Sequence, residues 1–263
     1  MDERKKIKIA AVVGPTASGK TKLAVDICRA LNGEAVSCDS MQIYKYMDIA
    51  TAKPTVQEMC GIPHHMLDFL EPGEKYSVAA YCTEAGECID DISGRGKLPV
   101  LVGGTGLYYS SLIDNISFAD EDDDASIRSE LERRAESEGI ETLHRELSAI
   151  DPETAAQLHL NNRGRIIRAL EVYYKTGVTM SEQQRRSRLV EPKYDCTAIC
   201  LDVRDRQFLY DRIDRRVDIM IENGLIEEAR RFLSGELGKT SGQAIGYKEL
   251  QPYFSGEISL DDA

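Results

Sequence analysis

The sequence predicts an α/β protein in which a parallel-sheet core carries a phosphate-binding loop and is interrupted by a helical domain. Short apolar, β-branched runs that lead into glycine or polar turns predict the sheet. A change of composition after residue 117, to charged segments with helical spacing, predicts the insertion. The predicted parts are a first core segment (1–117), the helical insertion (118–192) and a second core segment (193–263).

The first element is a strand followed by a glycine-rich loop and a helix. The strand is the apolar run 7–13, and apolar residues at helical spacing run from Leu23 to Leu31. The loop fits G-x-x-x-x-G-K-[ST] in the context that this pattern requires. Backbone N–H groups and a helix N-terminus hold a phosphate chain in such loops, with Lys20 on the terminal phosphates and the Thr21 hydroxyl on Mg²⁺. We predict a di- or triphosphate site, with a ligand-free turn as the alternative, at Gly14, Pro15, Thr16, Ala17, Ser18, Gly19, Lys20 and Thr21.

Two further strands lead to the same edge of the predicted sheet. The run 34–38 leads into Asp39, and the run 98–102 leads into two glycines and Thr105. Ligands of open parallel sheets bind outside the carboxyl ends of the strands, so Asp39 and Thr105 face the phosphate loop. A plain turn is the alternative for each. An ATPase usually places an acid at the strand end beside this loop to hold Mg²⁺, and here that strand ends in glycine.

Helices are expected over most of the remaining chain. Ser77 caps a predicted helix over 77–89. The adjacent His64 and His65 are interpreted as a structural pair, with a positioning or RNA-side role as the alternative. In the insertion, the acidic run 120–124 is a linker or a helix start. Arg165 and Arg168 share one face of a helix whose inward residues are Ile166, Ile167 and Leu170.

The second core segment begins with a returning strand over 194–203, followed by an amphipathic helix over 204–223. The apolar residues of that helix are Leu209, Ile213, Val217 and Met220. Arg212 and Arg216 lie four residues apart on one face. Ordinary surface ion pairs with Asp211 or Asp218 are the alternative explanation for the two arginines. Arginines near a phosphate loop more often clamp phosphate, because the planar guanidinium binds oxyanions in a bidentate manner.

Composition and charge narrow the class of protein. No apolar run approaches the roughly 20 residues of a membrane span, and seven cysteines without a C-x-x-C pair indicate free thiols in the cytoplasm. Net charge is −12, which by itself disfavours a nucleic-acid partner. Its distribution does not, because residues 161–188 hold seven Lys and Arg against two Glu, whereas residues 118–153 hold four Arg against thirteen Asp and Glu. A partner responds to the field within roughly 8–10 Å, so the basic segment can bind RNA.

Six stretches in this order resemble the tRNA dimethylallyltransferases closely. They are G-P-T-A-S-G-K-T (14–21), D-S-M-Q-I-Y (39–44), G-G-T-G-L-Y (103–108), R-I-I-R-A-L-E-V (165–172), R-I-D-R-R-V-D-I-M (212–220) and A-I-G-Y-K-E (244–249). Such proteins transfer a dimethylallyl group from its diphosphate to N6 of adenine 37, next to the tRNA anticodon. Their fold is a phosphate-loop α/β core with an inserted helical domain that binds the anticodon stem-loop. They usually continue into a basic, aromatic helix that these 263 residues lack, as a fragment or a naturally short form would.

The resemblance implies roles for particular residues. Residues 14–21 and Arg212 would hold the diphosphate of dimethylallyl diphosphate, with Lys20 and Arg216 neutralising it and Mg²⁺ near Thr21. Asp39 would be the general base and Thr105 a donor to the leaving group. The residues implied in tRNA binding are Asp39, Ser40, Met41 and Gln42 along the flipped-out adenine, and Gly164, Arg165, Ile166, Ile167 and Arg168 on the stem-loop. A monomer without membrane contact is expected.

Three other functions stay open at this stage. An adenylate isopentenyltransferase would prenylate free AMP, ADP or ATP, and the basic helical insertion argues against it. A small-molecule kinase would need an acid where residues 103 and 104 are glycines. A nucleotide-dependent switch would form no product, and the candidate base and phosphate clamp disfavour it.

Overall fold

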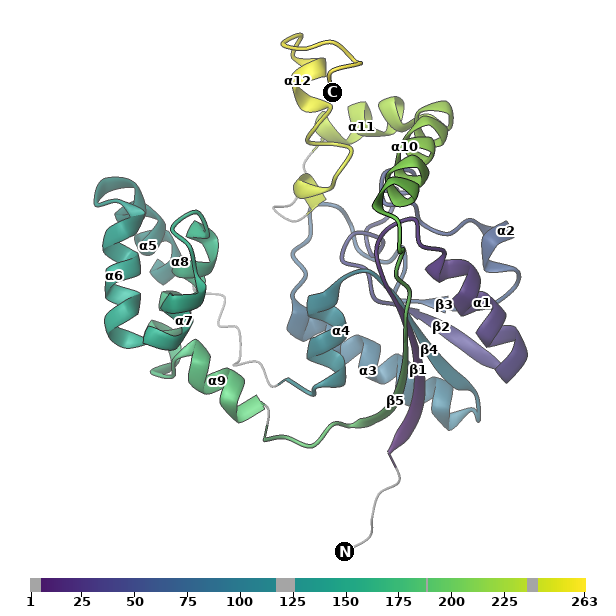
Figure 1. The fold of residues 1–263 in the computed structure, drawn as a ribbon, viewed down its shortest axis with the longest axis horizontal. Helices are drawn as coiled ribbons and strands as arrows, with labels where there is room; N and C mark the ends of the chain where they lie inside the picture. Colours follow the sequence, from purple (N-terminus) through teal and green to yellow (C-terminus); the bar gives the residue numbers. More distant parts are fainter. Residues whose placement is uncertain (1–5, 117–125, 188, 236–240) are drawn as a thin grey trace, which may run out of the picture. The chain divides into compact units, whose positions relative to one another are not determined.

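The structure, a computed structural model, describes residues 6–116, 126–187, 189–235 and 241–263, apart from the side chain of Gln243. Contacts divide the chain into two compact units (Figure 1). The first, here called the core unit, comprises Met1–Ile113 and Lys193–Ala263, and the second, the helical unit, comprises Asp114–Pro192. The insertion was predicted over 118–192, and the acidic run at 120–124 lies outside the described residues.

A five-stranded parallel sheet forms the centre of the core unit, in the order β3-β2-β4-β1-β5. In chain order the strands are β1 (Ile7–Val13), β2 (Gly33–Ser37), β3 (His64–His65), β4 (Leu98–Gly103) and β5 (Tyr194–Cys200). In register, Val13 lies between Gly103 of β4 and Cys200 of β5, so the three strands end at one edge. The predicted α/β class is confirmed.

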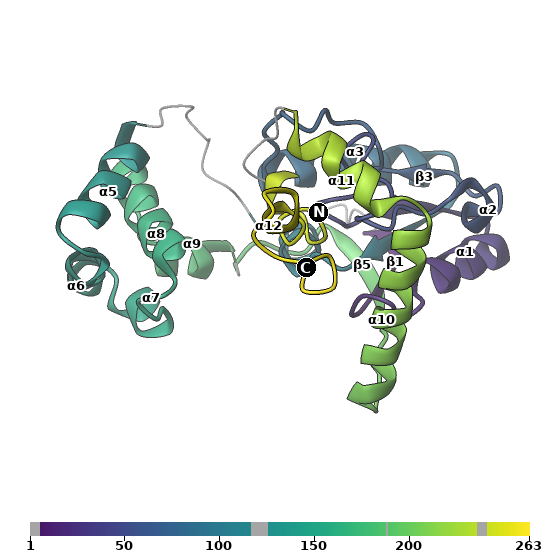
Figure 2. The same cartoon turned by 90° about the horizontal axis from the view of Figure 1, so that it is seen from above.

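Helices cover both faces of this sheet (Figures 1 and 2). α1 (Lys20–Leu31) packs on one face, and α3 (Val78–Gly94) and α4 (Gly106–Ile113) on the other. Successive strand residues point to opposite faces, so Val12 joins Ala24 of α1 in one core cluster while Ala11 joins Tyr81 of α3 in another. Strands buried on both sides appear as unbroken apolar runs, which is why the sequence identifies them.

A smaller core, centred on α11 (Leu225–Leu233), adjoins the sheet region. It consists of Ile43, Tyr44 and Met47, together with Leu225, Ala229, Phe232, Ala244, Tyr247 and Leu250. α10 (Arg206–Glu222) directly precedes α11 and contacts it. The sequence predicts an apolar stripe on α10, but no side chain of that helix is buried, and Val217 is 43% exposed. The remaining elements here are α2 (Val56–Met59), η1 (Ser241–Gln243) and α12 (Gln251–Phe254).

The helical unit contains α5 (Ser126–Ser137), α6 (Ile140–Ile150), α7 (Pro152–Gln157), α8 (Arg163–Thr176) and α9 (Met180–Ser187). α7 begins with proline in its first turn after the Asp151 cap, where the missing N–H costs nothing. The core of the unit comprises Leu131, Leu143, Leu147, Ile166, Ile167 and Leu170. Beside it, the carboxylate of Glu171 is 5% exposed and pairs with Arg128, Arg168 and Lys175.

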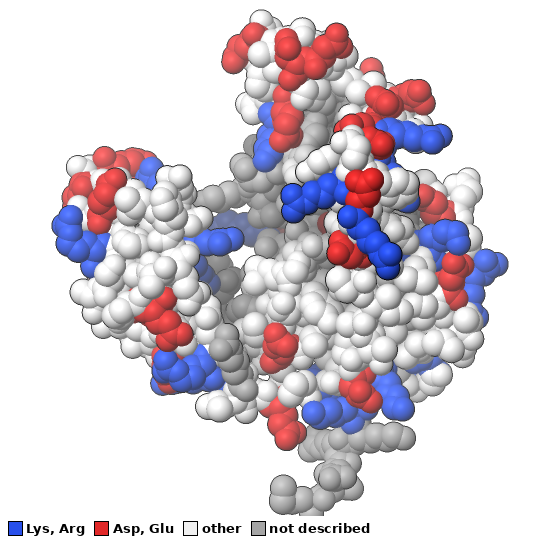
Figure 3. All heavy atoms as spheres, viewed as in Figure 1, with Lys and Arg blue, Asp and Glu red and all other residues white. Residues whose placement is uncertain are grey.

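Charges are unevenly distributed over the core unit. On the face seen in Figure 3, Asp and Glu gather on the C-terminal segment around α12, both signs mix over α10, and uncharged surface extends over β5. This edge strand exposes Thr197 and Ile199. Among the described residues, the helices are all too short or too polar to cross a membrane.

Candidate active site

The phosphate loop connects β1 to α1 and its backbone is unusual at two glycines. Gly19 has φ +95, in the left-handed region that glycine adopts without strain. At Gly14 a Cβ atom would lie 2.5 Å from the Leu201 carbonyl oxygen, so only glycine fits there. The loop folds back over the Lys20 ammonium, which donates to the carbonyl oxygens of Gly14 at 2.9 Å and Pro15 at 2.7 Å.

Asp39 follows β2 and forms an Asx turn. Its Oδ1 accepts hydrogen bonds from the backbone N–H groups of Met41 (2.9 Å) and Gln42 (3.3 Å). Its Oδ2 has no hydrogen-bond partner among the described residues, and Asp39 lines the cavity described below. The turn therefore fixes the carboxyl group and leaves one oxygen available for chemistry.

Thr105, after β4, contacts this turn instead of the cavity. Its hydroxyl accepts from the Ser40 N–H at 3.0 Å and donates to the Ser40 hydroxyl at 3.3 Å. A hydrogen bond from Thr105 to a leaving group would replace the one that it donates to Ser40. In this state Thr105 supports the chain beside Asp39.

α10 brings a row of arginines to the site. Arg212, Arg215 and Arg216 line the cavity from one face of the helix, with Phe208 and Ile219 on the same face. The Arg212 guanidinium lies 5.7 Å from the Phe208 ring centroid. The alternative explanation, ion pairs with Asp211 or Asp218, is wrong, because neither Arg212 nor Arg216 forms an ion pair with a described residue.

Lys20, Asp39 and Arg216 affect one another electrostatically. Burial lowers the pKa of Lys20, the Asp39 charge raises it, and the Arg216 charge lowers it further. Burial also lowers the pKa of Arg216, opposed by the charges of Glu58 and Asp39. Two partly desolvated cations thus lie near the Asp39 carboxylate, and Arg216 lies near Glu58 as well. An added anion between them would relieve this repulsion, which is the electrostatic requirement of a diphosphate site.

These groups surround one cavity of about 660 Å³, a size usual for small-molecule sites. Five cations line it, against two carboxylates. Of the predicted site residues, those that line it are Thr16, Ala17, Ser18, Gly19, Lys20, Thr21, Asp39, Gln42, Arg212 and Arg216. The predicted residues of the core unit that lie outside its lining are Gly14, Pro15, Ser40, Met41 and Thr105.

Several lining residues escaped the sequence analysis: Lys22, Thr51, Ala52, Pro54, Glu58, Leu67, Phe208, Arg215 and Ile219. Arg215 could have been found, because it is adjacent to Arg216 within the quoted 212–220 stretch. Thr51 and Pro54 follow no strand and no periodic pattern. Of the histidine pair, His65 is structural, with Nε2 2.7 Å from the Glu34 carboxylate, whereas His64 lines the cavity.

The predicted RNA-contacting segment begins α8 in the helical unit. Gly164 and Arg165 are exposed, and Arg165 forms no ion pair with a described residue. Arg168 is half-buried and pairs with Glu171 at 3.2 Å. Ile166 and Ile167 are 0% and 2% exposed and belong to the core of this unit. The prediction is therefore corrected for these two side chains, which are core residues and cannot reach a ligand.

The described residues at the site offer few ligands for a metal ion. Among the described residues, no three His, Cys, Asp or Glu side chains are grouped as a metal ion would require. The Thr21 side chain lines the cavity at the start of α1, which fits one hydroxyl ligand to an ion held mainly by phosphate oxygens.

The end of β4 leaves no room for an acidic side chain at Gly103. A Cβ atom on Gly103 would lie 2.0 Å from the Cys38 carbonyl oxygen, so a side chain cannot be accommodated there. Gly103 pairs with Val13 directly before the phosphate loop, where such an acid would hold Mg²⁺. The glycine is therefore a steric requirement of this fold.

Comparison with known proteins agrees with this geometry. A family model described as IPP transferase matches residues 42–263, and one described as isopentenyl transferase matches residues 7–69. The chain is 50% identical over 260 residues to a tRNA dimethylallyltransferase of Caldanaerobacter subterraneus, covering 98% of this chain and 82% of the relative. The chain belongs to the tRNA dimethylallyltransferase family. The predicted family and the predicted prenyltransferase class are thereby confirmed.

Solved structures of the family share the fold. The full-length tRNA isopentenylpyrophosphate transferase of Bacillus halodurans is 44% identical, with a TM-score of 0.68, over 98% of this chain and 80% of that one. A eukaryotic dimethylallyltransferase acting on tRNA is 30% identical, with a TM-score of 0.79, over 95% of this chain and 64% of that one.

Proposed function

We propose that this protein transfers a dimethylallyl group from dimethylallyl diphosphate to N6 of adenine 37 in tRNA and releases diphosphate. The observation that carries the proposal is the cavity in which Lys20 and Arg216, both partly desolvated, lie near the Asp39 carboxylate. It combines an anion site with a base, and the fold excludes an acid at Gly103.

In the proposed reaction the residues have separate tasks. The phosphate loop, Lys20 and the arginines of α10 hold the diphosphate and stabilise the charge that it gains on leaving. The free Oδ2 of Asp39 accepts the proton that N6 loses as it bonds to carbon 1 of the prenyl group, whose bond to the diphosphate oxygen breaks. Mg²⁺ near Thr21 would neutralise part of the leaving group's charge.

The five-carbon chain needs apolar surroundings. Leu67, Phe208 and Ile219 line the same cavity and supply apolar side chains from two segments. Exclusion of water from this part of the site would protect the reacting carbon from hydrolysis. We further propose that the protein acts as a monomer in the cytoplasm, where its RNA substrate occurs.

For RNA, we propose that the anticodon stem-loop binds the basic face of α8, with Arg165 on a phosphate. Prenylation of free AMP, as in an adenylate isopentenyltransferase, is the rival activity. The test is competition: the protein is given dimethylallyl diphosphate, Mg²⁺, and equal concentrations of AMP and an anticodon stem-loop that contains the target adenine. Prenylated stem-loop in large excess supports the proposal, whereas preferential prenylation of AMP refutes it.

A further inference from the structure

The segment 48–54, here called the wall loop, forms part of the cavity wall and contains no helix or strand. Thr51, Ala52 and Pro54 line the cavity. Ala52 has φ +45, a left-handed conformation that costs free energy for a residue with a side chain. Such a backbone persists only where surrounding contacts fix it, so the contacts of the wall loop bear on the shape of the site.

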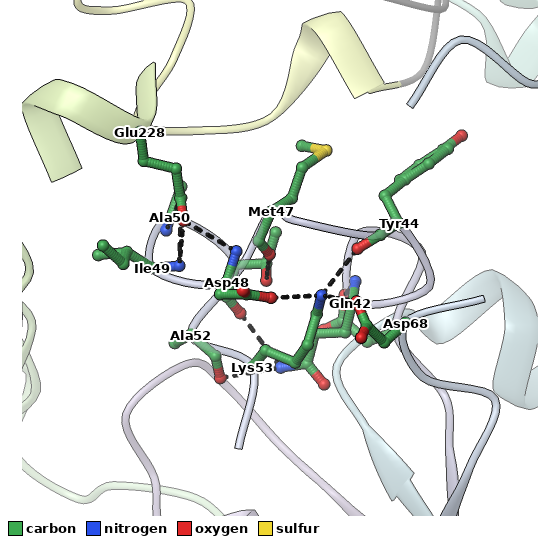
Figure 4. Close-up of polar contacts among 12 residues, drawn as sticks. Gln42, Tyr44, Met47, Asp48, Ile49, Ala50, Ala52, Lys53, Asp68 and Glu228 are labelled. Atoms are coloured by element: carbon green, nitrogen blue, oxygen red, sulfur yellow. Dashed lines mark hydrogen bonds and ion pairs between the residues drawn. The ribbon is translucent and has the colours of Figure 1, made fainter. Parts of the chain in front are cut away.

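Glu228 of α11 holds one end of the wall loop. Its side chain reaches three consecutive backbone N–H groups, and Figure 4 shows it extending from the helix toward the loop. Oε2 accepts from Asp48 at 3.0 Å and from Ile49 at 2.9 Å, and Oε1 accepts from Ala50 at 3.0 Å. Glu228 is 7% exposed. A buried carboxylate that three amides solvate replaces much of the water it has lost.

Tyr247 completes this carboxylate site. Its hydroxyl is buried and donates to Oε1 of Glu228 at 2.7 Å. Burial, followed by the hydrogen bond to Glu228, raises the pKa of Tyr247, so the hydroxyl keeps its proton and remains a donor. Tyr247 belongs to the small core around α11, and Glu228 is a buried residue of the same helix.

Gln42 holds the other part of the wall loop and connects it to the candidate base. Its side-chain amide donates to the carbonyl oxygens of Thr51 and Ala52, each at 3.1 Å. Its backbone N–H donates to Oδ1 of Asp39. One side chain thus joins the wall loop to the turn that orients Asp39.

Lys53 fixes the end of the wall loop. Its ammonium donates to Oδ1 of Asp48 at 2.6 Å, to Oδ1 of Asp68 at 2.7 Å and to the Tyr44 carbonyl oxygen at 2.8 Å (Figure 4). Its side chain is 8% exposed. All three N–H donors of the Lys53 ammonium are occupied, so Lys53 stabilises the wall loop and has no donor left for a ligand.

We propose that Glu228 is a positioning residue for the prenyl transfer: it fixes the wall loop, which through Gln42 keeps the Asp39 carboxyl group in place against the acceptor amine. This proposal rests on the proposed function. The phosphate loop is built on β1 and α1, and among the described residues no hydrogen bond joins residues 14–21 to Gln42, the wall loop or Glu228. Loss of Glu228 should therefore affect the chemical step and spare binding of the diphosphate.

The test compares Glu228→Gln with Glu227→Gln, an exposed residue on the same helix that loses the same charge. Glutamine keeps the shape of Glu228 but turns an NH₂ group toward backbone N–H donors. We expect kcat for tRNA prenylation to fall about 10–100-fold, since a displacement of about 1 Å can cost 10²-fold. We expect the Kd for dimethylallyl diphosphate to change less than about twofold, and amide hydrogen exchange to accelerate at residues 48–50. Glu227→Gln should match the wild type in all three.

A double-mutant cycle separates positioning from general stability. If Glu228 acts through Gln42, adding Glu228→Gln to Gln42→Ala should lower kcat much less than it does in the wild type. If Glu228→Gln folds poorly, Tyr247→Phe, which removes a single donor, should show the same pattern at smaller size. Additive effects, unchanged kcat, or donor affinity lost in proportion to the folded fraction would each overturn the proposal. A wild type that prenylates no RNA would instead refute the proposed function.

Discussion

The two ends of β2 carry carboxylates in opposite situations. Glu34, at the amino end, is 2% exposed, and its oxygens bind Arg95 at 2.6 Å, Lys97 at 2.6 Å and His65 at 2.7 Å. Asp39, beyond the carboxyl end, has one oxygen bound to its own turn and the other without a partner among the described residues. The first carboxylate has both oxygens occupied by these partners and stabilises the fold. The Asp39 carboxylate lies near Lys20 and Arg216 without forming an ion pair with either. Its second oxygen can therefore act on a bound ligand.

The largest effect on activity is expected from Asp39→Ala. As the proposed general base, Asp39 should contribute a factor of about 10²–10⁴ to turnover, with modest loss of donor affinity. Single-turnover kinetics with dimethylallyl diphosphate and a stem-loop measure it. Turnover equal to that of the wild type would remove Asp39 from the chemistry.

Arg216→Gln tests the cations that face Asp39. Loss of a charged hydrogen-bond donor should weaken the binding of dimethylallyl diphosphate about 10–100-fold, as titration calorimetry would show. Burial lowers the pKa of Lys20, so this side chain loses its charge at a lower pH than an ordinary lysine. As the pH rises, the affinity for dimethylallyl diphosphate should therefore begin to fall earlier than it would with an ordinary lysine. Arg133, an exposed residue that pairs with Glu130 on α5, is the matched control, and Arg133→Gln should leave donor binding unchanged.

Glu34→Gln tests the carboxylate at the amino end of β2. We expect the free energy of unfolding to fall by about 1–2 kcal/mol, since its partners still reach water, while kcat at 25 °C is retained. The cations, Arg95 first, hold the pKa of Glu34 well below its usual value. Its stabilisation is therefore complete above about pH 4.3, the usual value for glutamate, and is lost as the pH falls through its folded-state pKa. Urea unfolding at pH 7 and in acid should show the gap between the wild type and the variant closing in acid.

The smallest effect is expected from the arginines of α8. Arg165→Ala should weaken stem-loop binding and lower its salt slope by about one, as for a single phosphate contact. Arg168→Ala should do less, because Glu171 already engages that guanidinium. Binding measured across salt concentrations decides this, and unchanged slopes in the double variant would place the RNA elsewhere.

Local patterns predicted the parts of the site that local chemistry defines. The phosphate loop and Asp39 follow buried strands, and a parallel sheet brings such strand ends together without further information. The row of arginines on α10 was visible in part as the pair Arg212 and Arg216, whose spacing puts them on one face. Ile166 and Ile167 were assigned both to RNA and to the interior, and helical geometry favours the interior.

The wall loop could not be predicted in the same way. Its anchor is Glu228, about 180 residues further along the chain, and a glutamate in an amphipathic helix looks like any solvated charge. The position of Thr105 illustrates a second limit. The sequence places its hydroxyl at the correct edge of the sheet, but the hydrogen bond that it donates to Ser40 depends on a turn that only three-dimensional contacts define.

The central claim is that the phosphate loop holds a prenyl diphosphate as a leaving group. The direct measurement is mass spectrometry of nucleosides from tRNA incubated with the protein, dimethylallyl diphosphate and Mg²⁺. We predict adenosine carrying one added five-carbon unit, formed only with the prenyl donor and lost in Asp39→Ala. Consumption of ATP with phosphorylated product in the absence of any prenyl donor would contradict the account.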